Sequence, residues 1–152
     1  MNVRPAGTGD CSDVARMRAA LWPDGSVEEH ARDLVEMLAG AWSAAYPYVV
    51  LVAETDDGRL IGFADVTVRS RADGCDPKRA AGYLEGWYVA EDQRRRGIGA
   101  ALMTAAEEWA TAQGCVEMAS DTWITNEGSQ RAHEALGFEV VDRVVTYCKR
   151  LA

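Results

Sequence analysis

The sequence predicts an α/β fold in which a central mixed, mostly antiparallel sheet is flanked by about four helices. Residues 48–54 and 60–68 are apolar, β-branched runs on either side of Asp56-Asp57-Gly58, an arrangement typical of an antiparallel hairpin. The apolar run 83–89 precedes apolar residues at helical spacing from Ile98, and another strand-like run follows. Strand, helix and strand in this order favour a right-handed crossover and therefore a mixed sheet.

The composition predicts an ordinary globular protein. The chain has 152 residues, 48% hydrophobic and 26% charged, and we expect one domain over residues 1–152. No apolar run approaches the roughly 20 residues needed to cross a bilayer. The first residues lack the basic start and long apolar segment of a signal peptide. We therefore expect a cytoplasmic protein with no membrane partner.

The charge balance and the cysteines exclude further classes. The 24 acidic residues exceed the 16 basic ones, which argues against a nucleic-acid partner and suits a small cationic molecule. The four cysteines are widely separated in the sequence and form no Cys-x-x-Cys pair. His30 and His133 lie near none of them. These spacings predict free thiols and no metal site.

The first half of the chain predicts a short strand and two helices. Asn2–Pro5 is a candidate opening strand, and turn residues then lead to a predicted helix over residues 10–21. Ser26 followed three residues later by Glu29 is a capping box that begins a second helix. Trp22 falls in the bend between the helices, where it either fills the core or lines a cleft.

The second half predicts a long helix, a strand, a short helix and a final hairpin. The long helix runs from Ile98 to a C-cap at Gly114, and residues 116–121 follow as a strand. A short helix opens at Asn126 and closes at Gly137. Residues 138–141 and 143–149 are predicted as the final pair of strands.

Glu85 is out of place in the apolar run 83–89. A carboxylate among such neighbours must be paired, face a cavity, or have a raised pKa. It is therefore a candidate functional residue.

The segment from Glu91 to Ala100 has the features of an anion-binding loop. Gly97 and Gly99 allow a tight turn and a close approach of backbone N–H groups, and the following helix points its positive dipole end at the same place. Three arginines, at positions 94–96, add permanently charged donors suited to phosphate. Neither the P-loop pattern nor the Rossmann pattern is present.

The run Gln93-Arg94-Arg95-Arg96-Gly97-Ile98-Gly99-Ala100 resembles the pyrophosphate loop of the GCN5-related N-acetyltransferases (GNAT), and the predicted order of elements resembles that fold over the whole chain. Further segments resemble the aminoglycoside 6'-N-acetyltransferases of this fold: Leu21-Trp22-Pro23, Gly62-Phe63-Ala64-Asp65, Gly74-Cys75-Asp76, Leu84-Glu85-Gly86, Glu117-Met118-Ala119-Ser120-Asp121-Thr122 and Ala135-Leu136-Gly137-Phe138-Glu139. Two positions depart from that pattern, because Trp123-Ile124-Thr125 replaces a polar turn and Arg71 stands where an aromatic is expected.

The resemblance implies a polycationic aminoglycoside as acceptor. Carboxylates gathered at a cleft favour such a ligand by charge. Taken singly, each carboxylate is also open to interpretation as a solvated or capping acid. The implied substrate-binding residues are Trp22, Glu85, Asp121 and Asp142, with Arg71 as a doubtful fifth.

The resemblance also implies acetyl-CoA as co-substrate. Trp87, Tyr88 and Val89 would offer backbone groups to the acetyl and pantetheine amides, and Asn126 would hold the pantetheine side. His133 is expected to pack near the cofactor rather than to catalyse. The residues implied to wrap the pyrophosphate are Arg95, Arg96, Gly97, Ile98, Gly99 and Ala100.

The expected reaction is direct acetyl transfer, with Glu85 as the base that takes a proton from the amine. Tyr147 is either the acid for the departing thiolate or a packed strand residue. Two alternatives stay open, namely a GNAT enzyme that acetylates a polyamine, small metabolite or protein, and a CoA-binding module without catalysis. The β-branched run 143–149 at a sheet edge predicts a homodimer, or else a monomer whose edge is blocked by charges.

Overall fold

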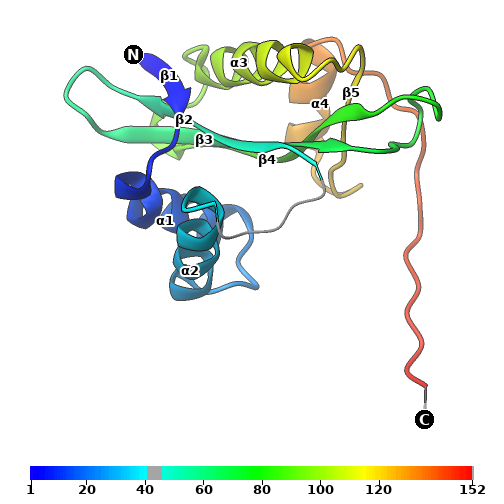
Figure 1. Ribbon diagram of the computed structural model, residues 1–152, viewed down its shortest axis with the longest axis horizontal. Helices are drawn as coiled ribbons and strands as arrows, with labels where there is room; N and C mark the ends of the chain where they lie inside the picture. Colours follow the sequence, from blue (N-terminus) through cyan, green and yellow to red (C-terminus); the bar gives the residue numbers. More distant parts are fainter. Residues whose placement is uncertain (41–45, 152) are drawn as a thin grey trace.

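Five strands form one sheet in the order β1-β2-β3-β4-β5 (Figure 1). The structure is a computed structural model that describes residues 1–40 and 46–151. The first four strands pair antiparallel, and β5 pairs parallel to β4, so the predicted mixed and mostly antiparallel sheet is confirmed. The strands are β1 (Asn2–Pro5), β2 (Tyr48–Glu54), β3 (Leu60–Arg69), β4 (Ala81–Val89) and β5 (Met118–Ser120).

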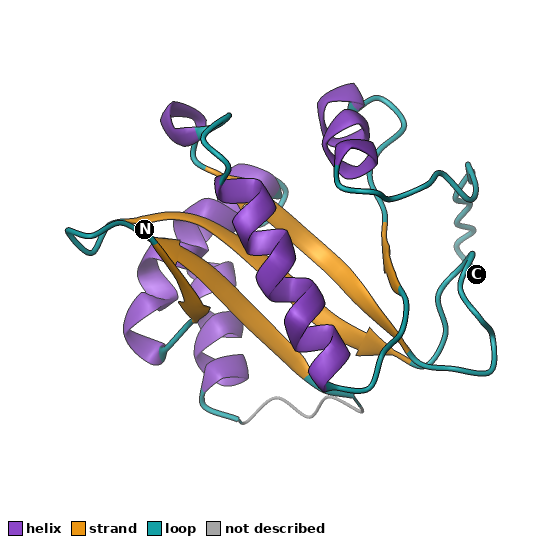
Figure 2. Ribbon diagram, turned by 90° about the horizontal axis from the view of Figure 1, so that it is seen from above, coloured by secondary structure: helices purple, strands orange, loops and turns teal. Residues whose placement is uncertain are grey.

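The helices lie on both faces of this sheet. Figure 1 shows α1 and α2 on one face and α3 on the other, and Figure 2 shows α3 crossing the strands with α4 beside β5. Short 3-10 turns precede α1 and follow β4, at Thr8–Asp10 and Glu91–Gln93. The helices are α1 (Cys11–Leu21), α2 (Val27–Leu38), α3 (Ile98–Ala112) and α4 (Glu127–Ala135).

The core has two layers because β2 and β3 are covered on both faces. Successive strand residues point to opposite faces, so Val50 and Val52 pack with α1 and α2, whereas Leu51 packs with α3. This explains why β2 is a continuous apolar run without polar alternation. Phe63 and Leu102 are the largest fully buried side chains of the respective layers.

The predicted helix signals are confirmed at both ends. Ser26 Oγ accepts from the Glu29 backbone N–H (3.1 Å), and Glu29 Oε2 accepts from the Ser26 N–H (2.8 Å), which completes the capping box of α2. Gly114 adopts φ +86° directly after α3, where a side chain would be strained. The helix and strand borders fall within a few residues of those predicted.

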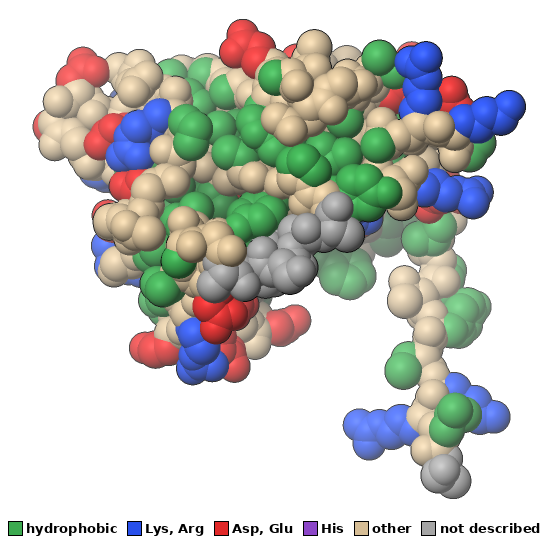
Figure 3. Space-filling model, viewed as in Figure 1, with side chains coloured by type: hydrophobic (Ala, Val, Ile, Leu, Met, Phe, Trp, Pro, Cys, Tyr) green, Lys and Arg blue, Asp and Glu red, His purple; other side chains and the backbone are tan. Residues whose placement is uncertain are grey.

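The predicted final hairpin is wrong for the isolated chain. Residues 138–151 contain no strand, and all of residues 139–151, the C-terminal tail, are exposed. Figures 1 and 3 show the tail running away from the sheet. β-branched residues favour an extended backbone, but a strand forms only where a neighbouring strand supplies hydrogen bonds. β5 is likewise shorter than predicted, with three paired residues.

β4 is longer than its partner β5, and this difference creates the site. The two strands pair only between Gly82–Leu84 and Met118–Ser120. The remaining residues of β4, from Glu85 to Val89, therefore have one edge that faces no strand within the described part of the chain.

Candidate active site

A β-bulge turns Glu85 out of the regular sheet. The pairing of β3 with β4 passes from Asp65↔Gly86 to Val66↔Leu84, so Glu85 has no Cα partner on β3. Bulges of this kind redirect side chains next to functional sites. The indole of Trp22, at the C-terminal end of α1, packs directly on the face of Gly86, where a Cβ would collide with it. Trp22 therefore contacts the residue that follows Glu85 in β4.

Glu85 is held by two residues of β3. Thr67 Oγ1 donates to Glu85 Oε1 (2.6 Å). Arg69 donates through Nε to Oε1 (2.9 Å) and through Nη2 to Oε2 (2.6 Å), which is the bidentate geometry of an arginine–carboxylate pair. Of the three alternatives expected for Glu85, which were pairing, a cavity or a raised pKa, the structure shows pairing. These bonds raise the pKa of Arg69.

Arg69 links Glu85 to a second predicted carboxylate. Its guanidinium carbon lies 3.4 Å from the centroid of the Tyr83 ring, a cation–π contact. The Tyr83 hydroxyl donates to Oδ2 of Asp121 (3.0 Å), the residue that directly follows β5. Burial and the Asp121 carboxylate raise the pKa of Tyr83 to about 12. We call Thr67, Arg69, Tyr83, Glu85 and Asp121 the Glu85 cluster.

The other predicted substrate residues do not join this cluster within one chain. Arg71 is exposed two residues after β3 ends. Asp142 lies on the tail, next to Val141, which packs on Gly74, and its carboxylate accepts from the Arg143 N–H (2.7 Å). Tyr147 is 88% exposed on the tail. The substrate and acid roles of these residues stay predictions.

A second arginine–carboxylate pair lies beneath the site, in the layer between the sheet and α1. Arg18 Nη2 donates to Asp65 Oδ1 (2.9 Å), and both side chains are less than 10% exposed. The guanidinium also contacts the Met37 sulfur of α2 (3.8 Å), while its Nε has no hydrogen-bond partner among the described residues. Burial raises the pKa of Asp65, and the charge of Arg18 offsets part of that effect.

The loop before α3 has the geometry of an anion cradle. Arg95 and Gly97 have φ values of +63° and +80°, and Arg95 is the one residue other than glycine with positive φ among those described. The first turn of α3 carries no acidic side chain, so its backbone N–H groups present a positive end. The three arginines are exposed around it.

Gly97 and Gly99 serve the local structure in different ways. A Cβ at Gly97 would meet nothing, but this glycine has a positive φ, which agrees with the tight turn predicted here. A Cβ at Gly99 would lie 2.9 Å from the Trp87 ring, so Gly99 lets α3 pack closely on β4. The expected approach of the backbone N–H groups to a ligand stays a prediction.

His133 lies against Trp87 of β4, and Asn126 lies at the start of α4. His133 contacts the Trp87 ring edge to face at 5.4 Å and bonds to the Ser129 carbonyl (2.7 Å) and to Ser120 Oγ (2.9 Å). Asn126 caps α4 by accepting from the Ser129 N–H (3.0 Å). His133 is thus packed and hydrogen-bonded, and its expected place near the cofactor stays a prediction.

Sequence reasoning missed Thr67, Arg69 and Tyr83. The available signal was strand alternation, because residues two apart on a strand share a face. Thr67 and Arg69 on β3, and Tyr83 and Glu85 on β4, satisfy this spacing. The bulge that aligns the two pairs has no clear mark in the sequence.

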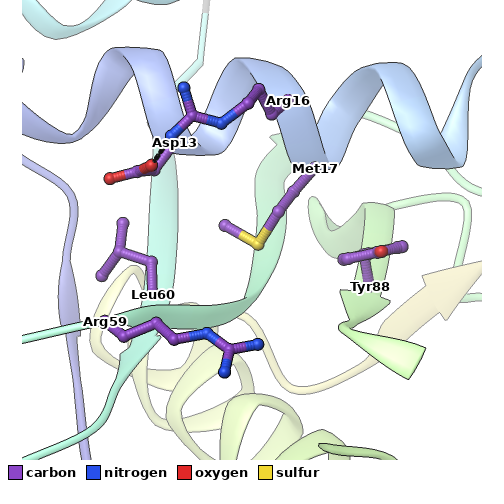
Figure 4. A pocket seen from close by; sticks show the side chains of 6 residues that line it. All are labelled: Asp13, Arg16, Met17, Arg59, Leu60 and Tyr88. Atoms are coloured by element: carbon purple, nitrogen blue, oxygen red, sulfur yellow. Dashed lines mark hydrogen bonds and ion pairs between the residues drawn. The ribbon is translucent and has the colours of Figure 1, made fainter. Parts of the chain in front are cut away.

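A separate hollow lies at the other end of β3 (Figure 4). It has a volume of about 420 Å³ and contains Tyr88 but none of the Glu85 cluster. Asp13 and Arg16, which line it, form an ion pair with each other. The lining residues are Asp13, Arg16, Met17, Arg59, Leu60 and Tyr88.

Two features of the structure concern a membrane and a metal ion as partners. No helix in the described ranges has the length and apolar character needed to span a membrane. Among residues 1–40 and 46–151, no three His, Cys, Asp or Glu side chains gather in a way that could hold a metal ion.

Comparison with known proteins identifies the class. Residues 14–138 match the acetyltransferase (GNAT) family, and the chain belongs to this family. An aminoglycoside N(6')-acetyltransferase type 1 of Klebsiella aerogenes is 45% identical over 149 residues, which cover 98% of this chain and 96% of that protein. A protein of the same description from Salmonella typhimurium is 40% identical over 151 residues, 99% of each chain.

Solved structures agree with this assignment. AAC(6')-Iy, solved in complex with the bisubstrate analogue CoA-S-monomethyl-acetylneamine, is 36% identical with a TM-score of 0.86, and the match covers 99% of this chain and 98% of that one. AAC(6')-IG from Acinetobacter haemolyticus, solved without ligand, is 30% identical with a TM-score of 0.87 over 100% of both chains. The GNAT fold predicted from the sequence is confirmed.

Proposed function

We propose that this protein transfers the acetyl group of acetyl-CoA to the 6'-amine of an aminoglycoside, and so gives resistance to such antibiotics. The observation that carries the proposal is the bulged Glu85, which stands with Asp121 on one side of a strand whose free edge leads to the anion cradle. The names of the relatives and the bisubstrate analogue bound to one of them support the same reaction.

The residues on the cofactor side fit acetyl-CoA. The free edge of β4 at Trp87, Tyr88 and Val89 offers backbone donors and acceptors to an amide-bearing chain, as a strand edge does for a peptide. The loop at Arg95 and Gly97 and the first turn of α3 would hold the diphosphate. A thioester bound there supplies the acetyl group.

The acceptor side would remove a proton from the incoming amine. An ammonium is not a nucleophile, so Glu85, directly or through a water, takes one proton before attack. The amine lone pair then forms the N–C bond and the C–S bond breaks. The nitrogen gives up its second proton to water as the amide forms, and the departing thiolate takes up a proton. No acyl-enzyme is needed. Tyr147 remains our candidate donor of that last proton, and in this role it would have to be brought to the site by the tail.

The test of this function is Glu85→Gln. The amide keeps the shape of the side chain and loses its basicity, so we expect kcat/KM for kanamycin to fall at least tenfold, about 1.4 kcal/mol of transition-state stabilisation. The Kd for acetyl-CoA should stay unchanged. Glu107→Gln, at an exposed position of α3, is the matched control. Undiminished turnover of Glu85→Gln would remove Glu85 from the mechanism.

The acceptor class is tested by the release of free thiol from acetyl-CoA. Kanamycin and tobramycin should support turnover, with spermidine and a lysine peptide as competing acceptors. Turnover with the peptide alone would assign the chain to protein acetylation, and absence of turnover with every acceptor would favour a CoA-binding module. Expression in a susceptible bacterium should raise the inhibitory concentration of kanamycin if the enzyme acts in the cytoplasm, where we place it.

We propose further that the protein works as a homodimer in which the tail of one subunit pairs with the other. β5 bonds to β4 on one side, and its other edge meets no strand among the described residues. An open strand edge and an extended tail rich in β-branched residues together favour pairing with a second copy. Large exposed hydrophobic residues on this part of the chain are Trp123, Ile124, Val140, Val141, Val144, Val145, Tyr147 and Leu151.

The dimer is tested by light scattering after size exclusion at micromolar concentration. We expect about twice the one-chain mass of 16.5 kDa. After deletion of residues 145–152 we expect the mass of one shortened subunit. The shortened protein should keep its circular dichroism spectrum, because the tail adds nothing to the two core layers. A mass near 16.5 kDa for the full chain would refute the dimer.

A further inference from the structure

Arg69 occupies the position that an acceptor amine needs. Its Nε and Nη2 lie 2.9 Å and 2.6 Å from the two oxygens of Glu85, and Thr67 Oγ1 takes a further position on Oε1. The donor positions nearest the candidate base are therefore filled by a cation of the protein itself. An ammonium that gives its proton directly to Glu85 must approach the same oxygens.

The contacts of Arg69 are those of an exchangeable cation. Its side chain is 43% exposed, so it can turn toward water without opening the core. It lies on the face of Tyr83, a ring that binds ammonium groups as well as guanidinium groups. Tyr83 is in turn bonded to Asp121. Departure of Arg69 would leave two carboxylates and one aromatic face, which is a site for a molecule with more than one ammonium.

We propose that Arg69 is a placeholder cation: it neutralises Glu85 in the free enzyme, and the aminoglycoside displaces it to bind. One ammonium of the substrate takes the place of the guanidinium at Glu85, and a second lies over Tyr83 near Asp121. Arg69 thereby weakens the binding of every amine that uses Glu85, and it keeps the charge of the empty site low. This inference rests on the proposed function and names the step by which the acceptor enters.

The displacement can be observed directly by NMR of the arginine Nε–H groups. In the free enzyme the Arg69 signal should be sharp and slow to exchange, because the hydrogen is bonded to a carboxylate; the Arg69→Gln variant identifies it by its loss. Addition of kanamycin in the presence of CoA should shift or broaden this signal. The Arg18 signal, from the buried pair, should stay in place and serves as the internal control.

Kinetics give the second test. Arg69→Gln should lower the Kd and KM for kanamycin about two- to fivefold, the range expected when a partly exposed ion pair no longer has to be broken, while kcat stays within twofold. Arg69→Lys keeps a cation but loses the bidentate fork, so its KM should fall between the two. Arg16→Gln makes the same change in net charge at an exposed pair on α1, and should not change KM.

Two results would overturn the inference. An Arg69 signal that stays unchanged at saturating kanamycin would show that the guanidinium is not displaced. A fall in kcat for Arg69→Gln with constant KM would make Arg69 a residue that positions Glu85. Both results leave the proposed function standing as long as the wild-type enzyme acetylates kanamycin. Failure of the wild-type enzyme to acetylate any aminoglycoside would instead remove the proposed function and this inference with it.

Discussion

Two arginine–carboxylate pairs lie on the same side of the sheet and differ in their access to water. The pair of Arg18 with Asp65 has side chains 7% and 8% exposed, whereas the pair of Arg69 with Glu85 has values of 43% and 31%. The pair of Arg18 with Asp65 joins α1 to β3. The pair of Arg69 with Glu85 joins β3 to β4 at the bulge. The chemistry of the two pairs is the same, so their surroundings decide what each can do.

Burial makes the first pair permanent. Breaking it would leave a charge in a medium that solvates it poorly, and the cost is several kcal/mol. The exposed pair is worth about 1 kcal/mol at most, because water replaces each partner readily. A substrate that binds through ammonium groups can therefore exchange with Arg69 but not with Arg18. We infer that the sheet carries one structural pair and one exchangeable pair.

The largest expected effect comes from breaking the buried pair. Arg18→Met replaces the arginine with an apolar side chain of roughly similar length and leaves Asp65 unpaired. We expect the free energy of unfolding to fall by about 3–5 kcal/mol. Asp65 already has a raised pKa, and the loss of Arg18 raises it further. A raised folded-state pKa favours the folded protein at low pH, so the loss should be smaller at pH 5 than at pH 8. Urea denaturation at both values measures this.

The double variant Arg18→Met/Asp65→Val is the control for that prediction. Removal of both charges should restore most of the lost stability, because the penalty belongs to the unpaired carboxylate. A single variant that loses less than about 1 kcal/mol would contradict the distinction between the two pairs.

A third network, of intermediate exposure, should give an intermediate effect. Asp10 accepts two bonds from Arg4 (2.7 and 3.1 Å) and one from the Gly7 N–H (2.7 Å). Arg4 also donates to Glu54 (2.8 Å), which ties β1 to β2. These bonds lower the pKa of Asp10, first of all through Arg4. We expect Asp10→Asn to cost about 1–2 kcal/mol at pH 7.

The pH dependence has the opposite sign to that of Asp65. A depressed folded-state pKa gives stability that is present above the unfolded value of about 3.9 and is lost as pH falls through the folded-state pKa. The difference between wild type and Asp10→Asn in chemical denaturation should therefore shrink below about pH 4. Asp33→Asn, an exposed carboxylate of α2, should show no such change. A constant difference down to pH 3 would contradict the role of the carboxylate charge.

The sequence allowed the fold and the turn before α3 to be predicted because their signals are local. The capping box at Ser26, the positive φ of Gly97 and the apolar run of β4 each follow from residues adjacent in the chain. The prediction of a final hairpin in the tail was wrong because it, too, rested on local signals alone. The β-branched residues of the tail favour an extended backbone, but a strand also needs a partner strand, and residues 139–151 pair with none among the described residues.

The Glu85 cluster was only half predictable. Glu85 stood out as a charge in an apolar strand, and the family resemblance pointed to Asp121. Arg69 was not predicted as a site residue, because an arginine at the end of a strand is ordinary on an exposed surface. Its meaning depends on the bulge at Glu85, which has no Cα partner on β3, and a bulge is a property of two strands in register.

The smallest expected effect sharpens the comparison most. Arg69→Gln should change the free energy of unfolding by less than about 1 kcal/mol, because its ion pair is half exposed and Glu85 keeps its bond to Thr67 and access to water. Urea denaturation alongside Arg18→Met measures both pairs under one condition. Arg16→Gln, which breaks an exposed pair within α1, gives the change in the free energy of unfolding expected for an arginine that does not stabilise the fold. A loss for Arg69→Gln as large as that for Arg18→Met would show that both pairs hold the fold together, and Arg69 would then be too firmly held for a substrate to displace.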